Sequence, residues 1–235
     1  MKKRCFIAGA GEYTGLVLPG TDDYIIAADA GYAELISRGI IPDLVVGDFD
    51  SLGAVPDHPN IVSSPAEKDD TDMMLAVKEG LSLGFDMFVI DGGLDGRLDH
   101  TIANLQVLVY LSRNGARGIL LGRKMCVTAV TDGSIRFDPG RQYPELELSG
   151  CDPIADTEAG MRGVVSVFSV GDAAMGVTLT GLKYPLDNAT ITCDYPIGVS
   201  NEFTGTPTAV SVSKGTLLVT WSVRGTGVGC HGESL

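Results

Sequence analysis

Short apolar runs alternate with longer helical stretches over the first half of the chain, and this alternation constrains the fold more than any other feature. Five apolar or β-branched runs are expected to be strands: Cys5–Ala8, Tyr24–Ala28, Leu44–Val46, Met87–Ile90 and Gly118–Leu121. Three stretches are expected to be helices: Ala33–Arg38, Thr71–Leu83 and Asp99–Arg113. This order indicates βαβ units and a mostly parallel sheet covered on both faces. It predicts a three-layer, Rossmann-like α/β domain over residues 1–124.

After Lys124 the helical pattern stops and strand-like runs follow at short intervals. These runs are Val127–Val130, Val164–Val170, Val177–Thr180, Ala189–Cys193, Ala209–Val212 and Leu217–Val223. The pattern is typical of an all-β sandwich or barrel, so residues 125–235 are predicted to form a β-sandwich domain. Segment 138–162, rich in Pro, Gly and acidic residues, is expected to be a long loop, and Gly225–Leu235 a frayed tail.

The formal net charge is −13, with 17 Lys plus Arg against 30 Asp plus Glu. This balance disfavours binding to nucleic acid or to an anionic membrane surface. The basic start, Met1–Arg4, leads into the apolar stretch Cys5–Ala10, which is broken by Gly9, Gly11 and Glu12 and is expected to be a first buried strand. No later run approaches the roughly 20 apolar residues that span a bilayer. The five scattered cysteines form no zinc-like spacing. Reduced thiols in a cytoplasmic protein are the simplest interpretation.

Aspartates gather at two places where chemistry is expected. Gly47–Ser51 reads Gly-Asp-Phe-Asp-Ser directly after a predicted strand, and side-chain alternation along an extended chain would put Asp48 and Asp50 on one side. Glu67–Asp72 opens the second predicted helix with four acids. Ordinary turn aspartates and plain helix capping are the alternatives.

Carboxylates from both clusters would repel one another by roughly 3 kcal/mol per pair at 6 Å and an effective dielectric near 20. Such a group either takes up protons or binds a cation, and an all-oxygen donor set favours magnesium. The two clusters together therefore predict a Mg²⁺ site.

A third segment, Asp91–His100, places three glycines and Arg97 between a predicted strand and a predicted helix. Glycines allow close backbone approach, and a helix N-terminus beside an arginine suits a phosphate; the alternative is a flexible turn with a surface arginine. Gly9–Gly15 departs from the dinucleotide fingerprint and no Walker A motif is present. Asp29 follows another strand at the same expected sheet edge.

Taken together, the motifs resemble those of the thiamine pyrophosphokinase family. The matching segments, in order, are Ala28–Gly31, Pro42–Leu44, Gly47–Ser51, Lys68–Asp72, Gly96–His100 with Asn104–Leu105, Gly181–Leu186 and Val199–Glu202. The resemblance covers roughly residues 22 to 223. It implies an enzyme that transfers pyrophosphate from ATP to the hydroxyl of thiamine, giving thiamine diphosphate and AMP.

The resemblance also implies roles for individual residues. Asp48, Asp50 and Asp72 would be catalytic and hold magnesium with the ATP phosphates. The nucleotide would be bound by Asp29, Asp69, Thr71, Arg97 and Asp99, and thiamine by Tyr184, Ser200 and Asn201. Family members are homodimers whose active sites combine the α/β domain of one subunit with the β domain of the other.

Two departures from the family pattern stand out. Tyr184 occupies a position where many relatives have Trp, and segment 138–162 matches nothing in the pattern. Two other functions stay open: a non-catalytic sensor of nucleotide or thiamine diphosphate, and a pyrophosphokinase for another alcohol such as a pterin. The complete set of acids argues against the first, and Val199–Glu202 favours thiamine over the second.

Overall fold

The computed structural model describes residues 4–49, 53, 55–63, 70–137 and 163–223. Asp50, Asp69 and the predicted loop 138–162 lie outside these residues.

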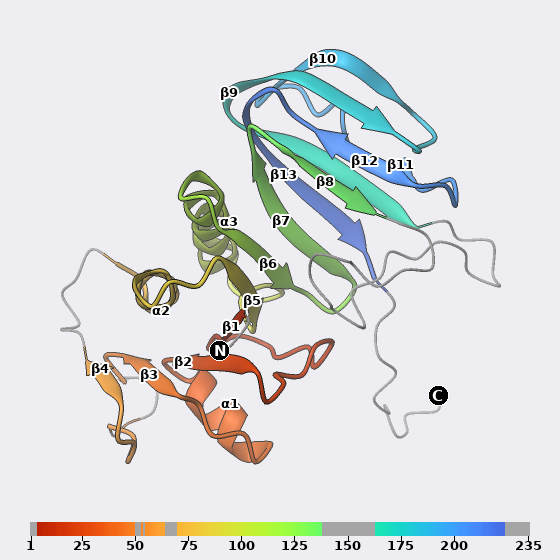
Figure 1. The fold of residues 1–235 in the computed structure, drawn as a ribbon. Coiled ribbons are helices and arrows are strands. Elements are labelled where there is room, and N and C mark those ends of the chain that lie inside the picture. Colours follow the sequence, from red (N-terminus) through yellow and green to blue (C-terminus); the bar gives the residue numbers. More distant parts are fainter. Residues whose placement is uncertain (1–3, 50–52, 54, 64–69, 138–162, 224–235) are drawn as a thin grey trace, which may run out of the picture.

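Six strands form the parallel part of the sheet, in the order β4-β3-β2-β1-β5-β6 (Figure 1). Their bounds are β1 Arg4–Ala8, β2 Asp23–Ala28, β3 Leu44–Gly47, β4 Ile61–Ser63, β5 Met87–Asp91 and β6 Arg117–Leu121. Strands β1, β2, β3, β5 and β6 are the five predicted ones, each longer by one residue at one end. The chain leaves β1 in one direction and later returns to its other side as β5. The carboxyl ends of β1 and β5 therefore flank a topological switch point, where ligands of open α/β sheets bind.

Three helices within the described residues cover both faces of this part: α1 Gly31–Ser37, α2 Asp72–Ser82 and α3 Leu98–Arg113. Leu35 of α1 packs in the cluster that contains Phe6 and Ala27, whereas Met73 of α2 packs in the cluster that contains Ile7. Phe6 and Ile7 are neighbours in β1, so the alternation of a strand sends them to opposite faces. The near-continuous burial of β1 follows from this double cover.

The remaining strands are antiparallel and extend the same sheet. They are β7 Met125–Thr131, β8 Ser134–Phe137, β9 Val164–Thr180, β10 Leu186–Thr192, β11 Asn201–Glu202, β12 Thr208–Ser211 and β13 Lys214–Ser222. Strand β7 pairs with β6 in register Ile119↔Thr128, which joins the two halves of the chain. Strand β9 pairs with β13 and β11 through its first part and with β10 and β12 through its second part.

The prediction of two separate strands, Val164–Val170 and Val177–Thr180, is wrong, because both belong to the single strand β9. Gly171 and Gly176 interrupt the apolar pattern between them, and both have positive φ, at 98° and 65°. The backbone nevertheless continues as one strand through this irregular stretch. Strands β4, β8 and β11 were missed because they have only three, four and two residues and none of them is a continuous buried apolar run.

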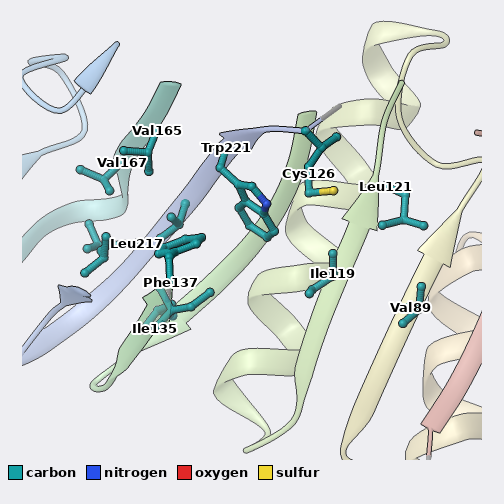
Figure 2. Close-up of a cluster of buried hydrophobic side chains, with 14 of the residues drawn as sticks. Val89, Ile119, Leu121, Cys126, Ile135, Phe137, Val165, Val167, Leu217 and Trp221 are labelled. Atoms are coloured by element: carbon teal, nitrogen blue, oxygen red, sulfur yellow. The ribbon is translucent and has the colours of Figure 1, made fainter. Parts of the chain in front are cut away.

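One hydrophobic cluster runs through both halves (Figure 2). Trp221 is fully buried, and its ring meets that of Phe137 at a centroid distance of 5.5 Å. Cys126 and Ile119 continue the cluster toward Val89 of the parallel strands. The predicted α/β class is thus confirmed as a mixed fold on one large connected sheet. None of the described helices is long and apolar enough to cross a bilayer.

Candidate active site

A pocket of about 450 Å³ lies at the switch point between β1 and β5. Its walls come from the segments that follow β1, β2 and β5 and from the starts of α2 and α3. The lining residues are Gly9, Ala10, Gly11, Ala28, Asp29, Thr71, Asp72, Met73, Gly92, Gly93, Leu94, Gly96, Arg97, His100, Thr101 and Asn104. The structure therefore brings Asp29, Thr71, Asp72 and Arg97 together from three segments of the predicted site.

Bare backbone forms one wall of this pocket. The N–H of Gly9 donates to the Asp91 carbonyl at 2.7 Å, and the N–H of Gly11 donates to the Gly92 carbonyl at 2.8 Å. A Cβ at Gly9 or Gly11 would lie 2.7 or 2.6 Å from the Gly92 oxygen, so only glycine fits. Gly9 and Gly11 do not complete a dinucleotide fingerprint; their role here is to let the backbone of two segments approach closely.

Asp29 is buried in the wall at the end of β2, with 7% of its surface exposed. Its Oδ1 has no hydrogen-bond partner among the described residues, although the atom is inaccessible to solvent. The residue has a φ of 49°, in the left-handed region. A buried carboxylate oxygen without a donor is costly unless a ligand or cation meets it.

The N-termini of two helices face the same pocket. Thr71 caps α2, since its hydroxyl accepts a hydrogen bond from the Met74 N–H at 3.2 Å, and Asp72 occupies the first turn. Helix α3 begins after Arg97, and Gly96, Arg97 and His100 line the pocket. Unpaired backbone N–H groups and the helix dipoles make this a favourable place for anions.

Arg97 and Asp99 form an exposed ion pair at this edge, with Nη2 and Oδ2 2.7 Å apart. The hydrogen bond to Asp99 raises the pKa of Arg97, and the bond from Arg97 lowers the pKa of Asp99. Arg97 lines the pocket whereas Asp99 does not. The guanidinium is therefore held at the rim by a carboxylate that an incoming phosphate can replace.

The predicted aspartate turn after β3 differs from the expectation. Asp48 follows the end of β3 at Gly47 and is half-buried, but Phe49 has a φ of 62°. The chain is therefore not extended at Phe49. Asp50 lies outside the described residues, so the prediction that Asp48 and Asp50 share one side stays untested. Within the described residues no group of three or more His, Cys, Asp or Glu side chains is arranged to hold a metal ion.

A second, larger pocket of about 1090 Å³ lies between the start of α3 and the faces of β7, β9 and β13. It shares Leu94, Gly96 and Thr101 with the first pocket. The other lining residues are mostly apolar: Asp95, Leu98, Leu105, Lys124, Met125, Val127, Val164, Ser166, Phe168, Ser200, Leu218, Thr220 and Ser222.

Of the three predicted thiamine residues, Ser200 lines the larger pocket, and its N–H donates to the Ser166 hydroxyl at 3.0 Å. The Asn201 side chain instead holds the backbone of Tyr184, accepting from its N–H at 2.9 Å and donating to its carbonyl at 2.7 Å. The Tyr184 ring is outside both pockets and 57% exposed.

The two halves of the chain match two models of one family. The model for the thiamin pyrophosphokinase catalytic domain matches residues 18–120, and the model for its vitamin B1 binding domain matches residues 154–217. A thiamine pyrophosphokinase of Bacillus subtilis is 29% identical over 207 residues, covering 85% of this chain and 88% of the relative. A thiamin pyrophosphokinase of Caenorhabditis elegans is 28% identical over 192 residues, covering 77% of this chain and 72% of the relative.

Solved structures agree with these matches. The crystal structure of the Bacillus subtilis thiamine pyrophosphokinase has a TM-score of 0.74 at 25% identity, covering 93% of this chain and 99% of that one. A thiamin pyrophosphokinase from Candida albicans shares the fold at 13% identity, with a TM-score of 0.71 and coverage of 94% and 89%. The chain belongs to the thiamin pyrophosphokinase family, the enzymes that transfer pyrophosphate from ATP to thiamine.

Proposed function

We propose that ATP occupies the 450 Å³ pocket with Mg²⁺ and that thiamine occupies the neighbouring 1090 Å³ pocket. One observation carries this division. The smaller pocket combines two helix N-termini, bare glycine backbone and an unpaired carboxylate oxygen, whereas the larger is mostly apolar. The shared residues Leu94, Gly96 and Thr101 put the two ligands within reach of each other.

The phosphates would lie against the starts of α2 and α3. Arg97 would exchange its ion pair with Asp99 for a phosphate oxygen, and Thr71 would keep the first turn of α2 in place. Asp29 and Asp69 would complete the nucleotide site. Asp69 lies outside the described residues.

The carboxylates fit a hard divalent cation. Magnesium keeps several waters and is commonly bound through one or two carboxylates plus substrate phosphates, so a closed cage of protein ligands is not required. Asp48, Asp50 and Asp72 would hold the ion, and the unpaired oxygen of Asp29 adds negative potential at the same edge. When bound, the ion neutralises charge on the polyphosphate.

The chemical step would be an in-line displacement at the β-phosphorus of ATP. The hydroxyl oxygen of thiamine forms the new bond to phosphorus, the bond to the oxygen shared with the α-phosphorus breaks, and AMP leaves. The hydroxyl proton passes to Asp72 or Asp50, or to solvent if the aspartates act only through their charge. Arg97 and the helix N-termini would stabilise the charge that develops on the phosphate oxygens, and holding both substrates in place would do much of the rest.

Residues 1–124 would form an α/β domain with Rossmann-like topology that binds ATP. Residues 125–235 would form a β-sandwich domain that binds thiamine. The long strand β9, which pairs with different neighbours along its length, supports the sandwich. Ser200 would contact thiamine in the larger pocket, while Asn201 would position Tyr184 for contact with substrate.

A homodimer with composite active sites would cover the apolar wall of the larger pocket. Leu98, Met125 and Phe168 line that pocket and are 74%, 36% and 37% exposed. A second copy would remove this surface from water. The described cysteines Cys5, Cys126 and Cys193 are not in disulfides, which supports a reducing, cytoplasmic location.

Phosphorus NMR of the protein with thiamine, Mg²⁺ and ATP tests the reaction. We expect AMP and thiamine diphosphate to appear together in equal amounts. ADP would instead indicate transfer of a single phosphoryl group, and no product would favour a sensor. Turnover of a pterin alcohol in preference to thiamine would assign a different acceptor.

A further inference from the structure

Asp91, the last residue of β5, has a completely buried carboxylate on which four donors converge. Its Oδ1 accepts from the backbone N–H groups of Thr14 and Gly92, each at 2.8 Å. Its Oδ2 accepts from the Thr14 hydroxyl at 2.9 Å and from the Gly15 N–H at 3.1 Å. Burial raises the pKa of this carboxyl, while the hydrogen bonds from Thr14, Gly92 and Gly15 act in the opposite direction.

These bonds tie together two segments that are far apart in the sequence. Thr14 and Gly15 lie 77 and 76 residues before Asp91, in the connection that follows β1. The same connection carries Gly9 and Gly11, whose N–H groups bond to the backbone of Asp91 and Gly92. The carboxylate therefore fastens the far end of a loop whose near end forms the wall of the smaller pocket.

The four donors require an acid at this position. A carboxylate accepts on both oxygens, whereas the amide of asparagine accepts on one oxygen and would present a donor to the other pair of donors. Asp91 does not line either pocket, so it would touch no ligand there. Its effect on a ligand must pass through the glycines in front of it.

We propose that Asp91 is a positioning residue for the nucleotide, which holds the loop 9–15 against the turn 91–93 and so fixes the backbone wall of the smaller pocket. This inference rests on the proposed function, because it takes that pocket as the nucleotide site. In this wall the glycine backbone of the loop 9–15 is in direct contact with the backbone of the turn 91–93. A shift of the loop therefore moves backbone N–H and C=O groups, which cannot adapt as side chains can. Nucleotide affinity should therefore depend on Asp91 more strongly than thiamine affinity.

The test compares variants of the whole enzyme by steady-state kinetics and by amide hydrogen exchange. Asp91→Asn keeps the shape and loses two acceptor interactions, so we expect the KM for ATP to rise about ten-fold while kcat and the KM for thiamine change less than about two-fold. Thr14→Val removes one donor and should raise the same KM by about three-fold, whereas Thr14→Ser should restore it. The double variant of Asp91→Asn and Thr14→Val should raise the KM for ATP by less than the product of the two single effects, because both substitutions remove hydrogen bonds from the same cluster.

Asp23→Asn is the matched control. Asp23 is also a buried aspartate of the sheet, and it accepts hydrogen bonds from Arg4 at 2.7 and 2.9 Å and from the Gly20 N–H at 2.8 Å. It lies at the start of β2, at the opposite end of that strand from Asp29. We expect Asp23→Asn to lower the melting temperature without changing the KM for ATP.

The amide readout needs no substrate. Exchange at Thr14 and Gly15 should become faster in Asp91→Asn and remain at the wild-type rate in Asp23→Asn. Folded Asp91→Asn or Thr14→Val with a wild-type KM for ATP would overturn the positioning role, as would an equal rise in both Michaelis constants. A wild-type protein without pyrophosphoryl transfer would overturn the proposed function and this role with it, whereas normal wild-type turnover with an unaffected Asp91→Asn overturns the role alone.

Discussion

The two neighbouring pockets differ in how they are built. The smaller one is lined by glycine backbone, by two helix N-termini and by the acids Asp29 and Asp72, while the larger one is lined mainly by side chains on the faces of antiparallel strands. Parallel strands deliver their carboxyl ends to one edge, which concentrates polar groups there. Antiparallel faces offer alternating side chains and so a broad apolar surface. One connected sheet thus supplies a polar pocket beside a more apolar one.

Removing a carboxylate near the ends of the parallel strands should have the largest effect on activity. Asp72→Asn and Asp48→Asn should each lower kcat by about a hundred- to a thousand-fold, because charge stabilisation at the phosphates is lost. Both residues are half-buried, so thermal melting should change little. Asp70→Asn is the control, since Asp70 pairs with Lys78 at 2.6 Å and should leave kcat near its wild-type value. Near-normal turnover in either site variant would exclude that residue from the metal site.

Disrupting the apolar wall should affect assembly and, through it, activity. Phe168→Asp places a charge on the exposed face of the larger pocket and should convert a dimer into a monomer with weak turnover. Sedimentation velocity measures the change. Ile41→Asp changes a side chain that is 74% exposed and lines neither pocket, so this control should stay dimeric. A wild-type protein that sediments as a monomer would refute the composite site.

Substitution of Asp29 should change nucleotide affinity and the stability of the fold in opposite directions. Asp29→Asn removes a buried charge with an unpaired oxygen and keeps a residue type that tolerates the φ of 49°. We expect the melting temperature without ligand to rise and the KM for ATP to rise about ten-fold, a trade of stability against function. Differential scanning fluorimetry with and without nucleotide tests both. A lower melting temperature would show that the carboxylate stabilises the fold.

Ser200 tests whether the larger pocket binds thiamine. Ser200 has a φ of 59°, so Ser200→Gly removes the hydroxyl without backbone strain. The KM for thiamine should rise about five-fold, the loss of one hydrogen bond, while the KM for ATP is unchanged. A change in the KM for ATP alone would reverse the assignment of the pockets.

The smallest effect concerns pH. The raised pKa of Asp91 means that the folded state binds a proton more readily than the unfolded state. This contribution to stability is fully present below the ordinary carboxyl pKa and is lost as pH rises through the raised value. Urea unfolding across this window should therefore show the advantage of wild type over Asp91→Asn shrinking as pH rises. An advantage that grows with pH would contradict the direction of the shift.

Five of the six strands of the parallel part were predicted because each is an apolar run that is buried almost throughout. The three helices between them have clear patterns of their own. The position of Thr71 as a cap and of Arg97 at a helix start followed from local chemistry that the fold keeps. The family followed from motifs in a fixed order. These features depend mainly on neighbouring residues.

The remaining features depend on contacts across the chain. The roles of Gly9 and Gly11 arise from contact with Gly92, which no local pattern reveals. The turn at Phe49 breaks the alternation that an extended strand would impose. The glycines of β9 interrupt its apolar pattern, so the sequence predicted two strands where there is one. The pairing of β6 with β7 joins the two halves in one sheet, and no local sequence pattern specifies which strands pair.

Calorimetric titration of wild type and Asp72→Asn with the magnesium complex of a non-hydrolysable ATP analogue tests the central claim most directly. We expect one site per chain in the wild type, with an affinity that depends on Mg²⁺, and at least about ten-fold weaker binding in the variant. Equal binding by both proteins, or binding that is indifferent to Mg²⁺, would contradict the placement of the metal and nucleotide at the ends of the parallel strands.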